Sequence, residues 1–358
     1  MDNKITKRRL SDFLSYEWIL MTVIAVVAVI LLELLYTMAG VRLTTGQQFK
    51  YFFDQSISGN ASSVNRLLKD DKTFSYDVLK VSSEGLISSY NVLSVRLEIQ
   101  DGDVLFTDCK DPAEGVANPE EVEDRTIRLK QVVDSFNVYS FEELELDAQT
   151  YLKKFIKDEN LSDSDLFERV KPGVLDQEKI SKIFRSRMKK DNRFRTQADI
   201  KKGIVSETAR IERLYKEVVV FSKLLDMEST YEGLFYRYSK YAQRRDEQET
   251  LKGKEQAKQA VDGEKQRLND LGLSGVLNSQ TQDEEFVYAL NLGKLPATTA
   301  QGKVPPSTIC KLKNTDGAEN VCLALFNFRK YQPHLQFETI SFVNTIVRNC
   351  STILDGVV

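Results

Sequence analysis

Histidine and tryptophan are almost absent from this chain, whose 358 residues include only His334 and Trp18. A single histidine excludes HExxH metalloprotease sites and metal sites built from several histidines. The sequence also lacks a phosphate-binding GxxxxGK[ST] loop, a dinucleotide-binding GxGxxG pattern and a GxSxG nucleophile turn. We therefore predict no catalytic residues, no cofactor and no metal ion, and we expect a protein that is not an enzyme.

Cysteine is also scarce, and the four cysteines form no CxxC pair, which excludes zinc ribbons and thioredoxin-like motifs. Cys310 and Cys322 flank residues 315–317 symmetrically, and a hairpin turn there would place them opposite each other. Two interpretations follow: a disulfide in an oxidising compartment, or two small buried thiols. We favour the thiols, because a cysteine-poor chain of this size does not depend on disulfides for its core.

One long hydrophobic run stands out, at residues 18–40, where Glu33 is the only charge. As a helix this run would extend about 34 Å, more than the ~30 Å hydrocarbon core of a bilayer. It predicts a transmembrane helix at 16–40. A cleaved secretory signal is the alternative, but its apolar region is usually shorter than this run.

The basic residues are distributed unevenly around this run. Lysine and arginine occupy positions 4, 7, 8 and 9 before it, and few basic residues follow it closely. The positive-inside bias then predicts a cytoplasmic tail at 1–15 and an extracytoplasmic main domain. The expected location is the cell membrane, with the lipid bilayer as one partner.

The pattern of the remaining residues predicts an α/β core that is interrupted by a large helical insert. We expect the first part of an α/β core at 45–139, a helical insert or second lobe at 140–284, and the second part of the core at 285–358. Within these parts the apolar spacing predicts the following elements: helices at 45–68 and 337–354, and strands at 104–108, 286–292, 309–313 and 321–328.

Two sets of residues are candidates for ligand binding. Asp108 ends a predicted buried strand, and ligands of open α/β sheets bind at the carboxyl ends of strands. Tyr231, Phe235 and Tyr238 would share one face if this segment were a helix, either as core residues or as an aromatic wall beside a ligand.

A basic stretch at 179–202 is the strongest charge feature. Lys189, Lys190, Arg193 and Arg195 lie at its centre and are our candidates for binding a polyanion, such as anionic lipid or a phosphate-rich cell-wall polymer. The alternative is a solvated helical face whose charge is offset by the acidic run at 142–147. Nucleic acid is not an expected partner of an extracytoplasmic domain.

The segment VLSVRLEIQDGDVLFTD, at 92–108, resembles part of the bacterial extracellular solute-binding proteins, in which a helix, a polar turn and a short strand ending in Asp follow one another. The pair FVYALNL and FETISFVNTIVRN is similar to the way that family returns to its first lobe. The resemblance implies a type II periplasmic-binding-like fold. The chain departs from the family in lacking a lipoprotein cysteine, and no ligand residue of the family can be transferred to it.

These observations lead to a functional hypothesis and an alternative. We expect a membrane-anchored, extracytoplasmic binding protein at the cell surface, which recognises a small solute or a protein partner without transforming it. The alternative is a structural or assembly subunit that docks through its transmembrane helix and helical insert. The third hypothesis is an enzyme whose active site contains Asp108.

Overall fold

The computed structural model describes most of the chain. The described residues are 18–39, 47–86, 89–99, 101–109, 129–136, 138–157, 175–188, 193–240, 284–296, 302–313, 315–329 and 332–357, with a few single residues between them. The chain divides into two compact units, Met1–Thr44 and Thr45–Val358. The fold described below is that of the second unit.

The first unit contains the helix α2 (Trp18–Ala39). Across the residues that the structure describes, however, no helix is long and apolar enough to cross a membrane. The expected transmembrane helix at 16–40, and with it the single-pass membrane protein, is therefore wrong.

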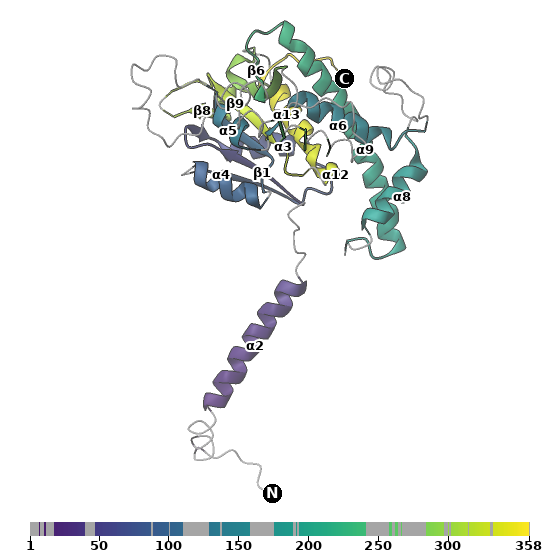
Figure 1. The fold of residues 1–358 in the computed structure, drawn as a ribbon. Coiled ribbons are helices and arrows are strands. Elements are labelled where there is room, and N and C mark those ends of the chain that lie inside the picture. The colour runs from purple at the N-terminus through teal and green to yellow at the C-terminus, as the bar shows by residue number, and fades with distance from the viewer. Residues whose placement is uncertain are drawn as a thin grey trace. The chain divides into compact units, whose positions relative to one another are not determined.

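A mixed sheet forms the centre of the second unit (Figure 1), with strand order β3-β1-β4-β9-β7-β6 and with β5 also paired to β9. A separate two-stranded sheet joins β2 to β8. The strands are β1 (Gln48–Phe53), β2 (Ile57–Gly59), β3 (Lys80–Gly85), β4 (Val104–Asp108), β5 (Val138–Tyr139), β6 (Phe235–Tyr238), β7 (Phe286–Asn291), β8 (Cys310–Leu312) and β9 (Val321–Phe326).

Strand direction changes across the sheet. The strand β1 pairs in parallel with β3 and β4, because the helices α3 (Ala61–Asp70) and α4 (Ser89–Glu98) supply the crossover connections that parallel pairing needs. The later strands β9, β7 and β6 are antiparallel to their neighbours. The C-terminal part of the chain thus joins the N-terminal part of the sheet through the pairing of β9 with β4.

Alternation along β1 divides the core into two sides. Phe49, Tyr51 and Phe53 lie in one buried cluster, and Phe52 lies in the other. This period of two is that of a strand, so the expected helix at 45–68 is wrong in its first half. Its second half is helical, as α3.

Helices cover both faces of the sheet (Figure 1). The larger cluster packs α3, α6 (Phe141–Lys153), α9 (Gln197–Asp226) and α13 (Glu338–Cys350) against one face. The smaller cluster packs α4 and α5 (Leu129–Ser135) against the other face. The remaining helices are α8 (Gln177–Arg187), the short α12 (Pro333–Gln336), and single 3-10 turns at Met227–Ser229, Leu292–Lys294 and Pro306–Thr308.

The long helix α9 begins at a capping box, in which Thr196 accepts from the Asp199 N–H and the Asp199 carboxylate accepts from the Thr196 N–H. The helix crosses α8 at Gly203. A Cβ atom at this position would lie 2.3 Å from Cζ of Phe184, so only glycine permits this close approach of the two helices.

The aromatic segment near residue 235 differs from the sequence expectation. Phe235 and Tyr238 belong to the strand β6, which pairs with β7, and Tyr231 precedes that strand in a turn. Gly233, with φ of +73°, reverses the chain between them. The expected shared helical face of these aromatic residues is therefore absent, since aromatic side chains also suit strands.

Cysteine pairing also differs from the expectation. Cys322 forms a disulfide with Cys109, with a Cα–Cα distance of 5.7 Å, across the junction of β4 and β9. Cys310 lies on β8, which pairs with β2, and it remains a buried thiol together with Cys350.

Candidate functional site

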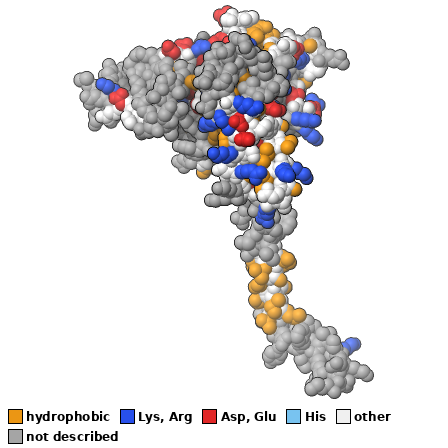
Figure 2. All heavy atoms as spheres, turned by 90° about the vertical axis from the view of Figure 1, so that its right-hand side faces the viewer, with side chains coloured by type: hydrophobic (Ala, Val, Ile, Leu, Met, Phe, Trp, Pro, Cys, Tyr) orange, Lys and Arg blue, Asp and Glu red, His pale blue; other side chains and the backbone are white. Residues whose placement is uncertain are grey.

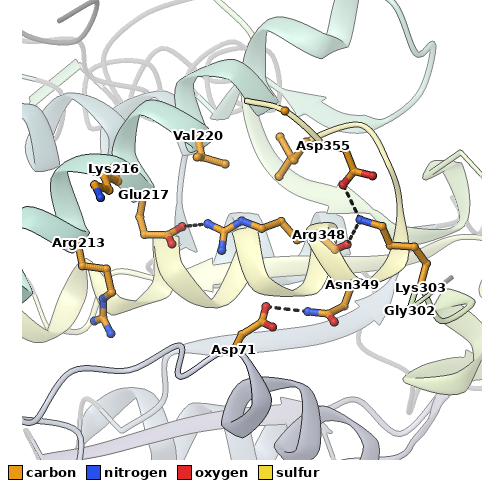
Figure 3. A pocket seen from close by; sticks show the side chains of 12 residues that line it. Asp71, Arg213, Lys216, Glu217, Val220, Gly302, Lys303, Arg348, Asn349 and Asp355 are labelled. Atoms are coloured by element: carbon orange, nitrogen blue, oxygen red, sulfur yellow. Dashed lines mark hydrogen bonds and ion pairs between the residues drawn. The ribbon is translucent and has the colours of Figure 1, made fainter. Parts of the chain in front are cut away.

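A polar pocket opens between α9, the C-terminal end of α13 and the final turns of the chain (Figure 3). Its volume is about 560 Å³, enough for a small solute. The lining residues are Asp71, Arg213, Lys216, Glu217, Val220, Gly302, Lys303, Arg348, Asn349, Leu354, Asp355 and Gly356.

One face of α9 supplies the first wall of the pocket. Arg213, Lys216, Glu217 and Val220 follow the i, i+3, i+4, i+7 spacing of a helical face. The other side of the same helix carries a buried apolar stripe, Ile211, Leu214, Val218 and Phe221. Packing of this stripe on the sheet fixes the direction of the polar face.

The end of α13 supplies the second wall. Arg348 forms an ion pair with Glu217, and Asn344 Nδ2 donates to the same carboxylate at 2.7 Å. Asn349 Nδ2 donates to Asp71 Oδ2 at 2.9 Å. These contacts hold Glu217 and Asp71 against α13, and Figure 3 draws those of Arg348 and Asn349.

Two loops close the rim of the pocket. Lys303 Nζ donates to the backbone oxygen of Arg348 at 2.7 Å and pairs with Asp355 at 2.5 Å. Gly302 and Gly356, with φ of +89° and +79°, stand where the two loops turn. A non-glycine residue would be strained at either position.

The pocket carries more positive than negative side chains. Arg213 pairs with Glu338 behind the wall at 2.7 Å, while Arg348 and Lys303 are paired at the rim. Among the described residues, Lys216 has no hydrogen bond or ion pair and is exposed. An anionic ligand would therefore meet a cation that forms no ion pair with any carboxylate in the described part of the chain.

A buried ion network lies farther along α9, and its groups are fully engaged with one another. Glu207 accepts hydrogen bonds from Tyr76 at 2.8 Å, from Arg187 at 3.0 Å and from Arg210 at 2.9 Å. Burial acts to raise the pKa of Glu207, but Arg210 and Arg187 outweigh it and lower the pKa to about 2. Asp77 accepts from Arg187 at 2.9 Å, and burial raises its pKa.

His334 lies beside this network. Burial, together with Arg187 and Arg210, lowers its pKa to about 3. Its imidazole is therefore neutral at physiological pH and does not act as a proton switch there. The network ties the loop before β3 to α8 and α9, and we interpret it as structural.

A second buried pair lies at the sheet. Arg329 donates to Asp103 at 2.9 Å, and the backbone N–H of Lys50 donates to the same carboxylate at 2.7 Å. Burial outweighs these contacts and raises the pKa of Asp103 to about 6. This pair fixes β1 and β4 to the segment that follows β9.

The predicted ligand residues lie apart in the sheet. Asp108 ends β4, next to the disulfide, whereas Phe235 and Tyr238 lie on β6, with β9 and β7 between the two strands. Tyr238 donates to Asp134 at 2.7 Å, and Phe235 is buried in the core. None of these residues lines the pocket.

The residues predicted to bind a polyanion also do not form one site among the described residues. The side chains of Lys189 and Lys190 lie outside the described residues. Arg193 turns inward to Asp77, at 3.1 Å, and to Asp191, at 2.7 Å, whereas Arg195 is exposed. Their binding of a polyanion stays a prediction.

Sequence reasoning did not identify the pocket residues. The spacing of polar residues along α9 could have indicated one wall of the pocket. The other walls come from segments that lie more than eighty residues from that part of α9 in the sequence. Within the part of the chain that the structure describes, no group of three or more His, Cys, Asp or Glu residues could hold a metal ion.

Comparison of the chain with protein-family models, with curated proteins and with solved structures found no match. The functional argument therefore depends on the geometry of the pocket and of the charged surfaces.

Proposed function

We propose that this protein binds a small anionic solute in the pocket between α9 and α13, without transforming it. The single observation that carries the proposal is Lys216, an unpaired cation at a pocket of about 560 Å³ that Arg213, Lys303 and Arg348 also line. A carboxylate or phosphate group would pair with Lys216 and gain from the surrounding positive charge.

Asp71 suggests a second feature of the solute. Its carboxylate accepts from the neutral amide of Asn349 and has no cation in that contact. A hydroxyl or amino group on the solute could donate to it. Small hydroxy acids, amino acids and phosphorylated compounds combine both groups, and we propose this class.

The disulfide supports an extracytoplasmic location for the folded unit. Cys109 and Cys322 lie 213 positions apart in the sequence, and such bridges persist in oxidising compartments. The return of β9 to β4 is consistent with the solute-binding resemblance, which remains part of this proposal.

A thermal-shift screen tests the function. Purified protein would be heated with phosphate, citrate, malate or glutamate, and with glycerol as the neutral control. A ligand present at about 100 times its dissociation constant stabilises the native state by about 2.7 kcal/mol, so at least one anion should raise the melting temperature by several degrees.

Lys216→Gln should weaken binding of that anion about 10-fold, which corresponds to about 1.4 kcal/mol. Lys223→Gln is the matched control, because Lys223 lies on the same helix but outside the pocket. Equal shifts with glycerol, or equal losses in the two variants, would exclude the proposed site.

A further inference from the structure

The basic stretch at 179–202 divides into two groups in the structure. Arg187 and Arg193 turn inward and pair with buried carboxylates, and Lys179 donates to the backbone oxygen of Ile156 at 3.0 Å. Four further described members of the stretch are exposed on α8 and on the first turns of α9: Lys182, Arg185, Lys201 and Lys202. We call these four residues the basic surface.

Three carboxylates of the acidic run at 142–147 accept hydrogen bonds from neutral groups outside the basic surface. Glu142 accepts from the backbone N–H of Val287 at 3.0 Å. Glu145 accepts from Ser222, and Asp147 accepts from Tyr139. These carboxylates keep their negative charge, so a solvated face balanced by this run is the alternative that the binding experiment below tests.

The acidic residues within the stretch are also engaged. Asp191 binds Arg193, and Asp199 caps the start of α9, where it also interacts with the charge of Lys202. Figure 2 faces the side of the molecule on which α8 lies in Figure 1, and it shows Lys and Arg side chains there with Asp and Glu side chains between some of them.

We propose that the basic surface binds a linear, phosphate-rich polyanion. Unlike Lys216, which lies in a pocket with three further cations, each cation of this open surface contributes little alone, about 0–1 kcal/mol in water, so a small anion gains too little from one contact here. A chain of closely spaced phosphates can contact cations on both helices at once, and the contacts then reinforce one another. The planar guanidinium of Arg185 also suits phosphate oxygens.

Fluorescence anisotropy with end-labelled inorganic polyphosphate tests this surface. The test variant combines Lys182→Gln, Arg185→Gln, Lys201→Gln and Lys202→Gln. The control variant removes the same charge from other exposed positions: Arg66→Gln, Lys69→Gln, Lys80→Gln and Lys313→Gln.

The wild type should bind at low salt, and the test variant should bind at least 10-fold more weakly. Its slope of log affinity against log salt concentration should be shallower by about 3, since each lost contact removes roughly 0.7. The control variant should bind within about threefold of the wild type. Circular dichroism melting of both variants would establish that each is folded.

Three results would overturn the proposal. The first is a wild type that does not bind polyphosphate at low salt. The second is equal weakening of binding in both variants, which would indicate a general charge effect. Binding of polyglutamate as tight as that of polyphosphate, with the same loss in the test variant, would instead identify an acidic protein segment as the partner. None of these results depends on the pocket near Lys216.

Discussion

Replacing Glu207 by Gln should destabilise the protein strongly, because this carboxylate is the centre of a buried ion network. Glu207 is fully buried and faces Arg187 and Arg210 within 3.0 Å. Glutamine keeps the shape of the side chain but removes the charge that balances the two guanidinium groups. Removing one partner of a buried ion pair costs about 3–5 kcal/mol, and we expect a loss in this range at pH 7.

The effect should depend on pH with a definite sign. The pKa of Glu207 is lowered from 4.5 to about 2 in the folded state, which corresponds to about 3 kcal/mol. A lowered pKa contributes stability that is complete above pH 4.5 and is lost as the pH falls toward 2. The difference between wild type and Glu207→Gln should therefore be smaller near pH 3 than at pH 7 by about 2 kcal/mol.

Urea unfolding followed by circular dichroism at pH 7 and at pH 3 measures both quantities. Glu212→Gln is the matched control, since Glu212 is an exposed residue of the same helix, and it should change the free energy of unfolding by less than about 0.5 kcal/mol. The reasoning is refuted if the two variants lose equal stability at pH 7, or if the cost of Glu207→Gln does not decrease at pH 3.

Other predictions concern the disulfide, a helix crossing and the sheet. Unfolded protein should expose two reactive thiols without reductant and four after reduction, and reduction should cost about 3–5 kcal/mol of stability; four thiols from the start would exclude the bridge. Gly203→Ala should cost about 1–3 kcal/mol by overpacking against Phe184, whereas Gly85→Ala, with open space around it, should cost less. Because the pKa of Asp103 is raised to about 6, wild-type stability should fall as the pH rises from 4 to 6, and Asp103→Asn should abolish that fall in urea titrations.

The sequence predicted the elements whose apolar residues repeat with one clear period. The strands at 286–292 and 321–328 are confirmed as β7 and β9, and the C-terminal amphipathic segment is confirmed as α13. In β7 and β9 every residue is buried, so a short continuous apolar run was a reliable signal of a strand.

Two aromatic segments were predicted as helices because their aromatic residues have helical spacing, and both predictions are wrong for the parts that form β1 and β6. Phe49, Phe52 and Phe53 fit a helical face, but they lie on both sides of the central strand β1. Tyr231, Phe235 and Tyr238 also fit a helical face, whereas tertiary pairing with β7 makes a strand of Phe235–Tyr238. Local spacing cannot reveal a strand partner that lies about fifty residues away.

The candidate pocket was out of reach of sequence reasoning for a related reason. Lys216 and Glu217 are on a predicted amphipathic helix, but Asp71, Lys303 and Arg348 reach the pocket only through the packing of distant segments. The disulfide illustrates the same limit, because β4 and β9 become neighbours only in the folded sheet.

Protection of Lys216 from an amine-reactive reagent tests the proposed pocket most directly. The protein would be labelled briefly with acetic anhydride, with and without the anion that gives the largest thermal shift, and acetylation would be measured by mass spectrometry. We predict that the anion slows acetylation of Lys216 at least severalfold and leaves Lys223, on the same helix outside the pocket, unchanged. Unchanged labelling of Lys216, or equal protection of both lysines, would contradict binding of an anionic solute in this pocket.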